Sequence, residues 1–379
     1  MQNPVRPDVA FFLPNLGGGG AERVLTNLAN AFVERGVAVD FVLGKAEGPN
    51  LAKLDSKVQV VDLGTNNVYG WLTPMVRYLK ERQPSAVLSA LHHANLVALW
   101  ASMLSSTKAR VIVGVHGMMS QDIENSNKKL AKVIPFLVKT FYPRADKIVC
   151  VSNGVAEELV RKYHLPRSKI QVIYNPVVTE EMFEMAEEPI DHPWFQLGQP
   201  PVILGVGRLT PAKDFGTLIK AFSLLRRKVE AKLVILGEGP ERGKLEHLVE
   251  ELGLKDDVSM PGFVENPYKY MRKSAVFVLS SRWEGLPTVL VEALALGIPV
   301  VSTDCPSGPA EILENGKWGR LVPVDDPKTL TDAILEAMND ERGKGVERAR
   351  NFVLDKIVEQ YLTLMRQIKN RNEAGDLNF

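Results

Sequence analysis

The chain has 379 residues, of which 45% are hydrophobic and 24% charged, the proportions of a soluble globular protein rather than a disordered or fibrous one. This length exceeds what one hydrophobic core normally organises, so two domains are expected. The 46 Lys and Arg residues nearly balance the 45 Asp and Glu residues, so net charge gives no reason to expect nucleic acid as a partner.

The two cysteines, Cys150 and Cys305, both lie in apolar strand-like or turn sequence. A disulfide framework and a thiolate metal site are therefore not expected. The N-terminal sequence lacks the apolar core of a signal peptide, and no run approaches the roughly 18 apolar residues of a membrane span. We expect a cytoplasmic protein.

Apolar strand-like runs alternate with helical stretches along both halves of the chain, which is typical of parallel sheets with crossover helices. In the first half the expected strands are 9–14, 37–44, 58–64, 86–91, 110–117 and 147–152. In the second half they are 201–207, 232–239, 258–264, 275–281, 299–304 and 319–324. The pattern predicts an α/β fold with two doubly wound, Rossmann-like domains.

The expected domains are residues 1–180 and 200–351. Residues 181–199 contain prolines and no strand-like run, so they are interpreted as a linker. Residues 352–370 form one more amphipathic helix with no strand after it.

Four successive glycines follow the first expected strand and precede a helix. Ligands of open α/β sheets lie at the carboxyl ends of the strands, and backbone N–H groups at a helix start favour anions. Gly18 and Gly19 are therefore candidate ligand contacts, with a flexible surface turn as the alternative. The sequence matches neither a Walker loop nor the spaced dinucleotide fingerprint.

Arg208 and Lys213 follow the first strand of the second half. Arg offers a planar fork of donors and Lys a point charge, so the two can converge on a diphosphate. Two solvated basic side chains are the alternative interpretation. Gly239 lies in a further glycine-bearing loop at the same sheet edge.

The stretch from residue 282 to 304 joins an apolar strand to a helix and the next strand. Pro287 suits the first helical position and Gly297 the left-handed residue just past the helix end, which predicts a helix over residues 287–296. Glu284 precedes this helix, beside the N–H groups of Gly285, Leu286 and Thr288.

Glu292 lies in the second turn of the same helix, among neighbours that are almost all apolar. The helix is therefore expected to be buried, and a buried carboxylate needs a partner. A nucleotide sugar fits this arrangement: Glu292 would face the ribose, the helix start the diphosphate and Glu284 the sugar hydroxyls.

With these motifs, the chain resembles the retaining GT-B glycosyltransferases of family 4 over nearly its whole length. Residues 284–292 look like the E-x7-E motif of that family, and residues 17–23, 115–117 and 207–213 match its other landmarks. The resemblance implies two Rossmann-like domains facing a cleft and a final helix that crosses back to the first domain. It also implies a nucleotide-sugar donor held by the second domain, an acceptor held by the first, and neither metal nor cofactor.

The resemblance assigns roles to individual residues. Arg208 and Lys213 would hold the diphosphate and neutralise the leaving group, Glu284 would contact the donor sugar, and His116 would lie near the anomeric centre. Glu292 would bind the ribose. The nucleobase would lie near Gly239 and Val264, and the remaining expected donor contacts are Gly18, Gly19, Gly285, Leu286, Pro287 and Thr288.

The family resemblance favours retention by attack from the leaving-group face, in which the departing phosphate helps to deprotonate the acceptor. A double displacement would instead need a carboxylate nucleophile. We expect a hexose or N-acetylhexosamine donor, with UDP favoured and GDP or ADP open. The expected acceptor is a saccharide or a polyprenyl-linked saccharide, in polysaccharide, lipopolysaccharide or glycoconjugate synthesis.

Residues 128–144 predict an amphipathic helix with a kink at Pro135. An aromatic, Phe136, falls within its basic face, which is typical of a helix resting on anionic headgroups. A solvated face with one stray aromatic is the alternative. The expected apolar stripe is Leu130, Val133, Ile134, Leu137 and Phe141, and the expected basic face is Lys128, Lys129, Lys132 and Lys139.

Three other functions share this fold class: a nucleotide-sugar epimerase, a phosphorylase and a catalytically idle sugar-nucleotide scaffold. The chain is short for a phosphorylase, and nucleotide-sugar epimerases lack this motif set. Both glutamates, the basic pair and His116 disfavour the scaffold. Residues 191–194 have no assigned chemical role, and residues 304–309 follow a strand end beside the expected donor site.

Overall fold

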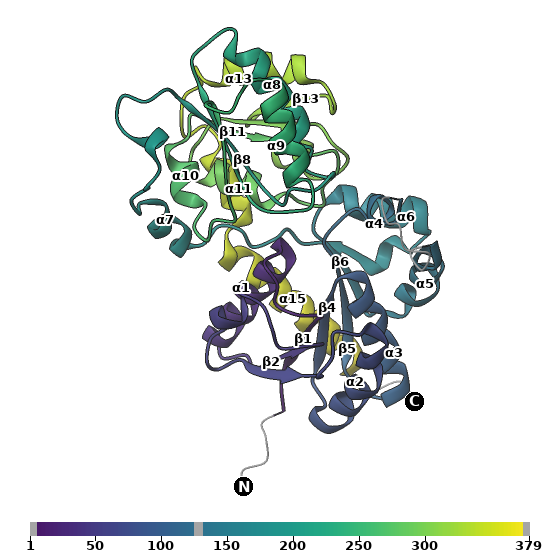
Figure 1. Cartoon of the computed structure of the whole chain (residues 1–379). Coiled ribbons are helices and arrows are strands. Elements are labelled where there is room, and N and C mark those ends of the chain that lie inside the picture. The colour runs from purple at the N-terminus through teal and green to yellow at the C-terminus, as the bar shows by residue number, and fades with distance from the viewer. Residues whose placement is uncertain (1–5, 125–131, 374–379) are drawn as a thin grey trace. The chain divides into compact units, whose positions relative to one another are not determined.

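A computed structural model describes residues 6–124 and 132–373 (Figure 1). The chain divides into two compact units. Unit 1 comprises the described residues up to Pro176 together with those from Leu354 onwards, and unit 2 comprises Val177–Val353. The chain therefore passes from one unit to the other near residues 176 and 353.

The described part of unit 1 contains one sheet of seven parallel strands in the order β3-β2-β1-β4-β5-β6-β7. The strand order reverses between β1 and β4, which is the switch point where ligands bind in such sheets. The strands are β1 (Val9–Leu13), β2 (Val39–Leu43), β3 (Gln59–Asp62), β4 (Ala86–Ala90), β5 (Arg110–Val115), β6 (Lys147–Cys150) and β7 (Ile170–Val172).

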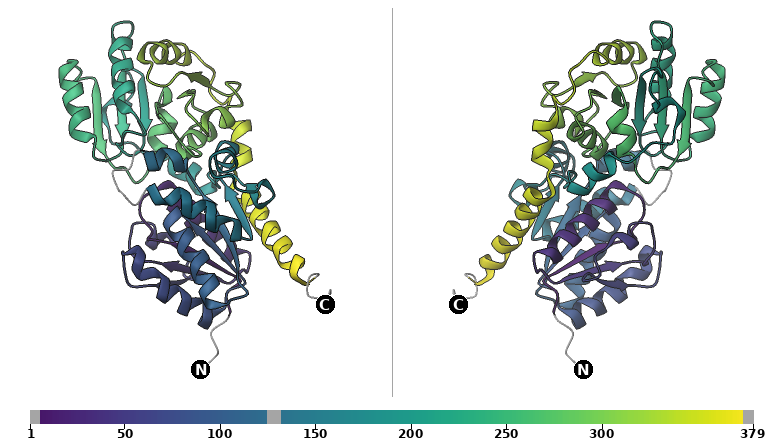
Figure 2. Two further views of the ribbon diagram at one scale, coloured as in Figure 1. Left: turned by 90° about the vertical axis from the view of Figure 1, so that its right-hand side faces the viewer. Right: turned by 90° about the vertical axis from the view of Figure 1, so that its left-hand side faces the viewer.

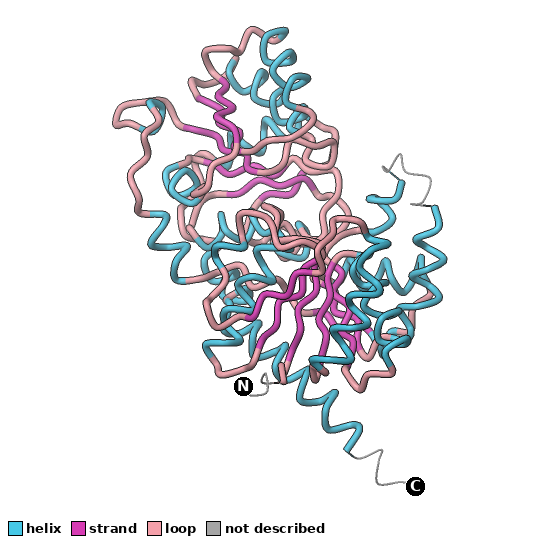
Figure 3. The backbone as a smooth tube through the Cα atoms, turned by 60° about the horizontal axis from the view of Figure 1, so that its bottom comes forward, coloured by secondary structure: helices cyan, strands magenta, loops and turns pink. Residues whose placement is uncertain are grey.

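Helices flank this sheet, as Figure 3 shows in cyan. They are α1 (Gly20–Glu34), α2 (Val68–Arg82), α3 (His92–Ser105), α4 (Met119–Glu124), α5 (Ile134–Phe141), α6 (Asn153–Tyr163) and α15 (Leu354–Glu373). The sequence did not predict β7, because three residues with a central Gln171 give no apolar run.

Unit 2 contains a sheet of six parallel strands in the order β10-β9-β8-β11-β12-β13. They are β8 (Val202–Val206), β9 (Lys232–Leu236), β10 (Val258–Gly262), β11 (Val276–Leu279), β12 (Val300–Thr303) and β13 (Arg320–Val322). Its helices are α7 (Glu180–Ala186), α8 (Phe215–Arg226), α9 (Arg242–Glu251), α10 (Tyr268–Lys273), α11 (Thr288–Ala295), α12 (Pro309–Ile312), α13 (Pro327–Ala337) and α14 (Val346–Ala349). The predicted α/β class with two parallel-sheet domains is confirmed.

The final helix packs in unit 1, as expected for a helix that returns to the first domain. Ile357, Val358, Tyr361 and Leu364 are buried in the same core as Phe32 of α1. Figure 2 shows α15 in yellow along unit 1. The helix begins at Leu354 rather than in the predicted range from residue 352, because residues 350–352 form a 3-10 turn and Val353 is extended.

The segment 181–199 belongs to unit 2 and is not a free linker. Thr179 caps α7 by accepting a hydrogen bond from the Met182 N–H, and the Asn266 side chain donates to the Met185 carbonyl at 2.7 Å. His192 contacts the Ser259 hydroxyl on the edge strand β10 at 3.3 Å. The prediction missed this packing because it relied on the absence of strands.

None of the described helices is both long enough and apolar enough to cross a bilayer.

We predict that Ile357→Ala destabilises unit 1 by about 2–5 kcal/mol, because it removes a fully buried side chain from the core. Urea unfolding measures the loss. Gln367→Ala, on an exposed position of the same helix, is the matched control and should change the free energy of unfolding by less than about 0.5 kcal/mol. Equal effects of the two substitutions would contradict the packing of α15 in this core.

Candidate functional site

Two loops at the carboxyl edge of the unit 2 sheet are joined by an ion pair. Lys213 follows β8 and Glu284 follows β11, and the Lys213 Nζ lies 2.5 Å from the Glu284 Oε1. Both side chains are largely buried, with 22% and 11% of their surfaces exposed. The Ser281 hydroxyl donates a second hydrogen bond to the same carboxylate oxygen at 2.7 Å. The structure therefore brings together two of the predicted site residues.

The backbones of these loops are also tied to each other. The Arg282 N–H donates to the Ala212 carbonyl at 2.8 Å, and the Ser280 hydroxyl donates to the Lys213 carbonyl at 2.8 Å. They join Ala212 and Lys213 to residues that lie two and four positions before Glu284. The separation of the two charges is therefore set by the backbone and not only by their attraction.

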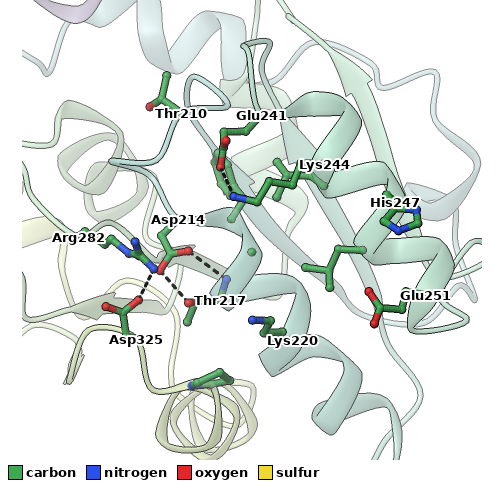
Figure 4. A pocket seen from close by; sticks show the side chains of 15 residues that line it. Thr210, Asp214, Thr217, Lys220, Glu241, Lys244, His247, Glu251, Arg282 and Asp325 are labelled. Atoms are coloured by element: carbon green, nitrogen blue, oxygen red, sulfur yellow. Dashed lines mark hydrogen bonds and ion pairs between the residues drawn. The ribbon is translucent and has the colours of Figure 1, made fainter. Parts of the chain in front are cut away.

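A second ionic network, drawn in Figure 4, is formed by Arg282, Asp214 and Asp325. Arg282 pairs with Asp214 at 3.1 Å and with Asp325 at 2.6 Å. Asp214 also caps α8 by accepting a hydrogen bond from the Thr217 N–H, and burial raises the pKa of its carboxyl. These side chains line a cavity of about 380 Å³ between α8 and α9. The network holds Asp214, next to Lys213, and Arg282, two residues before Glu284.

The helix that carries Glu292 begins one residue later than predicted. Pro287 is extended in ψ and is the residue before the first turn of α11, so it is not the first helical residue. No described side chain caps this helix start by a hydrogen bond. Gly297 has a φ of 74°, as predicted for the residue past the helix end, and Glu292 is fully buried, also as predicted.

The loop after β12 packs directly on the residues before α11. The Ser307 hydroxyl donates to the Gly285 carbonyl at 2.9 Å. Gly308 has a φ of 91°, and a Cβ placed there would lie 2.6 Å from Pro287 Cδ. Burial raises the pKa of the Cys305 thiol, in the same loop, to about 12. The charges of Glu284 and Lys213 are close enough to contribute to this pKa.

The glycines after β8 and β9 allow their loops to touch. Gly237 has a φ of 143°, and a Cβ there would collide with the Gly207 carbonyl oxygen. A Cβ at Gly239 would lie 2.4 Å from the Leu209 carbonyl oxygen. Val264 follows β10, whose last residue, Gly262, accepts a hydrogen bond from the Gly237 N–H at 2.8 Å. The loops that carry Gly239 and Val264 are thus neighbours, while their role toward a base stays a prediction.

Arg208 is exposed, and its side chain has no hydrogen bond or ion pair with any residue that the structure describes. It lies in the loop between Gly207 and Leu209, whose N–H donates to the Glu238 carbonyl at 2.8 Å. The structure therefore places Arg208 in the same β8–α8 loop as Lys213 and leaves its guanidinium accessible to a ligand.

In unit 1 the four glycines adopt ordinary backbone conformations. Gly19 is extended, with a φ of −79°, and α1 starts at Gly20 without a side-chain cap. The Glu22 carboxylate lies against Gly19, and the Asn50 side chain donates to the Gly17 carbonyl. A phosphate at Gly18 and Gly19 would meet this carboxylate, so an uncharged ligand suits the loop better.

His116 follows β5 and folds back over Gly114. A Cβ on Gly114 would lie 3.2 Å from the His116 Nε2, so the missing side chain makes room for the imidazole. Burial lowers the pKa of His116 to about 4, and a polar contact with Asn175 offsets part of this effect. The ring is therefore neutral at pH 7. Its Nδ1 is buried without a hydrogen-bond partner among the described residues.

Only part of the predicted helix over residues 128–144 lies in the described residues, since 125–131 fall outside them. Pro135 does not kink α5, because it lies in the first turn of this helix. Val138 is the buried residue of this helix, whereas Val133 of the predicted apolar stripe is 46% exposed. Phe136 is 67% exposed, as expected for its place in the basic face.

Sequence reasoning missed two histidines on unit 1. His92 and His93 follow β4 and begin α3, and their rings lie 4.1 Å apart between centroids. The available signal was their place directly after an apolar strand, at the edge where the other site residues were sought.

Two Rossmann-like units with parallel sheets, each with its polar loops at the strand ends, define the class of GT-B glycosyltransferases. The chain belongs to the glycosyl transferases group 1 family. The model of that family, described as "Glycosyl transferases group 1", matches residues 188–353, and the one described as "Glycosyltransferase Family 4" matches residues 18–181.

A relative from Campylobacter jejuni is 34% identical over 278 residues, which covers 72% of this chain and 73% of the relative. It is named N-acetylgalactosamine-N,N'-diacetylbacillosaminyl-diphospho-undecaprenol 4-alpha-N-acetylgalactosaminyltransferase. An uncharacterized glycosyltransferase from Methanocaldococcus jannaschii is 28% identical and covers 77% of this chain and 81% of its own.

Solved structures share the fold at low identity. A sucrose-phosphate synthase from Thermosynechococcus elongatus superposes with a TM-score of 0.78 at 20% identity, covering 97% of this chain and 100% of that one. HepE from Anabaena, solved with UDP and glucose, superposes with a TM-score of 0.77 at 20% identity, covering 95% of this chain and 100% of that one.

We predict that Gly308→Ala destabilises unit 2 more than Gly343→Ala. Both glycines have a φ near 90°, so the backbone strain of about 1–3 kcal/mol is common to both. At Gly308 the new Cβ would also press on Pro287, whereas at Gly343 nothing lies within 4 Å. Urea unfolding of both variants measures the difference. Equal losses would show that the loop after β12 does not press on the start of α11.

Proposed function

We propose that the protein is a retaining, metal-independent glycosyltransferase that moves a hexose or N-acetylhexosamine from a UDP-sugar to a saccharide or polyprenyl-linked saccharide. The observation that carries the proposal is the buried Lys213–Glu284 pair beside the uncapped start of α11. This position combines positive charge for a diphosphate with a carboxylate that accepts hydrogen bonds from sugar hydroxyls.

The ion pair explains how Lys213 and Glu284 divide diphosphate binding and sugar binding between them. A diphosphate competes with Glu284 for the Lys213 ammonium, since a phosphate oxygen is also a strong charged acceptor. Once Lys213 turns to the diphosphate, the Glu284 carboxylate is available for the sugar. The exposed Arg208 guanidinium supplies a second cation for the same phosphates. Glu292 binds the ribose, and the backbone at Gly285, Leu286, Pro287 and Thr288 lines the remaining donor site.

The chemical step relies on stabilising the leaving group. Preorganised positive groups lower the energy of the charge that develops on the departing diphosphate, so they supply much of the rate enhancement. The departing phosphate oxygen takes the proton of the acceptor hydroxyl on the same face, so no enzyme base and no metal or cofactor is required. His116, neutral at pH 7, donates a hydrogen bond to the donor sugar.

The remaining site residues are assigned to the nucleobase, the sugar and the acceptor. Gly239 and Val264 border the nucleobase, and Gly18 and Gly19 let the sugar or acceptor approach the backbone closely. The choice of UDP is supported by the fold relative HepE, which was solved with UDP and glucose. The choice of a polyprenyl-linked acceptor is supported by the Campylobacter jejuni relative, whose name includes diphospho-undecaprenol.

We predict that the protein releases UDP from at least one sugar in a panel of UDP-, GDP- and ADP-sugars, with EDTA present, when lipid-linked saccharide extracts are added. Lys213→Met should lower this release about 10- to 100-fold, because it removes a charged hydrogen bond to the leaving group. Lys220→Met is the matched control: it removes a lysine from the same unit that lines the α8–α9 cavity, and it should leave the rate unchanged.

Two outcomes contradict this proposal in different ways. An absence of nucleotide release from the whole panel favours an idle sugar-nucleotide scaffold, which nucleotide binding alone would then identify. A covalent sugar adduct on Glu284, found by mass spectrometry of the wild-type protein with donor, contradicts the same-face route. Glu284→Gln should lower turnover without trapping such an adduct.

We also propose that residues 128–144 contact an anionic membrane surface. The described part of this segment supports it with the exposed Phe136 beside the exposed Lys132 and Lys139. An aromatic side chain among lysines can insert at the headgroup boundary while the lysines meet anionic lipid.

We predict salt-sensitive co-sedimentation of the protein with vesicles containing phosphatidylglycerol, and a severalfold weaker association for Phe136→Ser. The matched control is Phe183→Ser, which removes an aromatic side chain that is 44% exposed on unit 2 and should not change the association. If the wild-type protein stays in the supernatant at low salt, the membrane proposal is wrong.

A further inference from the structure

Two histidines of unit 1 follow neighbouring strands at equivalent positions. β4 and β5 are parallel and in register, with Ala90 opposite Gly114. His92 and His116 each follow two residues later. Since neighbouring strands are about 5 Å apart, the two histidines emerge side by side at the carboxyl edge of the sheet, where ligands of this fold class bind.

The first turn of α3 is tied to the end of β5. The Asn95 side chain, which is 1% exposed, donates to the Gly114 carbonyl at 2.9 Å and to the Tyr142 hydroxyl at 3.1 Å. Asn95 lies three residues after His92, so this buried amide fixes the helix start against the strand that leads to His116. The start of α3, which carries His92, is therefore anchored to β5 by a buried hydrogen bond.

The backbone before His92 is strained. Leu91 has a φ of 70° and a ψ of 133°, a conformation that residues with a side chain rarely adopt. Such strain persists only where the surrounding structure enforces it, and it is concentrated at functional sites. The effect of this conformation is to redirect the chain at the end of β4, so that α3 starts with His92 next to the strand end.

The imidazole of His116 reaches toward β4. A Cβ on Gly114 would lie 3.2 Å from the His116 Nε2 and 3.6 Å from the Ala90 Cβ, so both atoms border the same small space. Ala90 is two residues before His92, so the ring of His116 lies near the strand end that leads to His92.

The protonation state of His92 indicates which kind of ligand it suits. Burial, with a smaller contribution from the adjacent His93, lowers the pKa of His92 to about 4. Neutral imidazole offers one donor and one acceptor, which matches a hydroxyl group. It carries no charge to attract a phosphate, unlike Arg208 and Lys213 in unit 2.

We propose that His92 is an acceptor-binding residue, which hydrogen-bonds a hydroxyl of a neutral saccharide beside the donor sugar held by His116. The inference rests on the proposed transfer reaction and assigns its acceptor subsite to the ends of β4 and β5. The part of the acceptor that is recognised here is a sugar ring with free hydroxyls, rather than a lipid diphosphate.

The test compares three substitutions at His92, using the UDP-sugar that gives the highest UDP release. The acceptor probes are octyl glycosides of glucose, galactose, N-acetylglucosamine and N-acetylgalactosamine. His92→Phe keeps a ring without hydrogen bonding and should raise the acceptor KM about tenfold, the effect of losing one neutral hydrogen bond of about 1.4 kcal/mol. The ratio of donor hydrolysis to transfer should rise by a similar factor. His92→Gln, which keeps a polar nitrogen, should recover part of the loss, and His92→Ala should not.

A binding measurement separates contact from folding effects. The imidazole C–H signal of His92, assigned by its loss in the variants, should shift when the probe is added to wild-type protein without donor. His164→Asn is the matched control, because His164 is an exposed helix-ending residue of unit 1 in a left-handed conformation that Asn tolerates. This variant should keep the wild-type KM.

The outcomes distinguish the inference from the function on which it rests. An absence of UDP release by the wild-type protein contradicts the proposed function itself. Transfer by the wild-type protein with an unchanged acceptor KM in His92→Phe overturns only the role of His92. If none of the four glycosides shifts the His92 signal or accepts sugar while UDP release proceeds, the assignment of a neutral saccharide to this subsite is wrong.

Discussion

The attraction between Lys213 and Glu284 is the interaction on which the candidate site depends. Two largely buried opposite charges at 2.5 Å are stable only because neighbouring groups hold them together, since desolvating each charge costs several kcal/mol. The hydrogen bonds from Ser281 and between the two loop backbones provide that support. A ligand that offers a better anion to the lysine and hydroxyls to the carboxylate can replace the pair without leaving either charge unpaired.

The parallel sheet determines where such a pair can form. All carboxyl ends of the strands in one sheet meet at one edge, so residues 71 positions apart in sequence become neighbours. The same constraint acts in unit 1, where it brings His92 and His116 to adjacent strand ends. The two units thus use one geometric rule with different chemistry: charged side chains in unit 2, and neutral imidazoles with glycine backbone in unit 1.

Much of this arrangement was predictable because it follows from patterns along the chain. Apolar runs followed by Gly, His or charged residues identified the sheets and most of the strand-end loops, and the apolar surroundings of Glu292 predicted its burial. The Lys213–Glu284 contact was not predicted, because both residues had been assigned to a ligand rather than to each other. Whether two strand-end side chains pair depends on loop conformation, which spacing does not reveal.

Other differences have equally local causes. The segment 181–199 was interpreted as a linker because it has no strand, yet Met182 and Ala186 are spaced to bury one face of a helix. The importance of His92 depends on the conformation of Leu91, and no residue preference predicts a leucine at positive φ. Sequence patterns therefore predicted the helices, the strands and the sheet edge that carries the site residues. They did not predict the strained backbone that joins a strand to the next helix.

The return of α15 to unit 1 has a consequence for biosynthesis. The core of unit 1 draws on residues near both ends of the chain, so the whole of unit 2 is made before that core can close. During translation the N-terminal strands emerge first, whereas α15, which completes their core, emerges only after unit 2. Unit 2 is continuous in sequence, so it can complete its fold before unit 1 does, although the synthesis of unit 1 begins first.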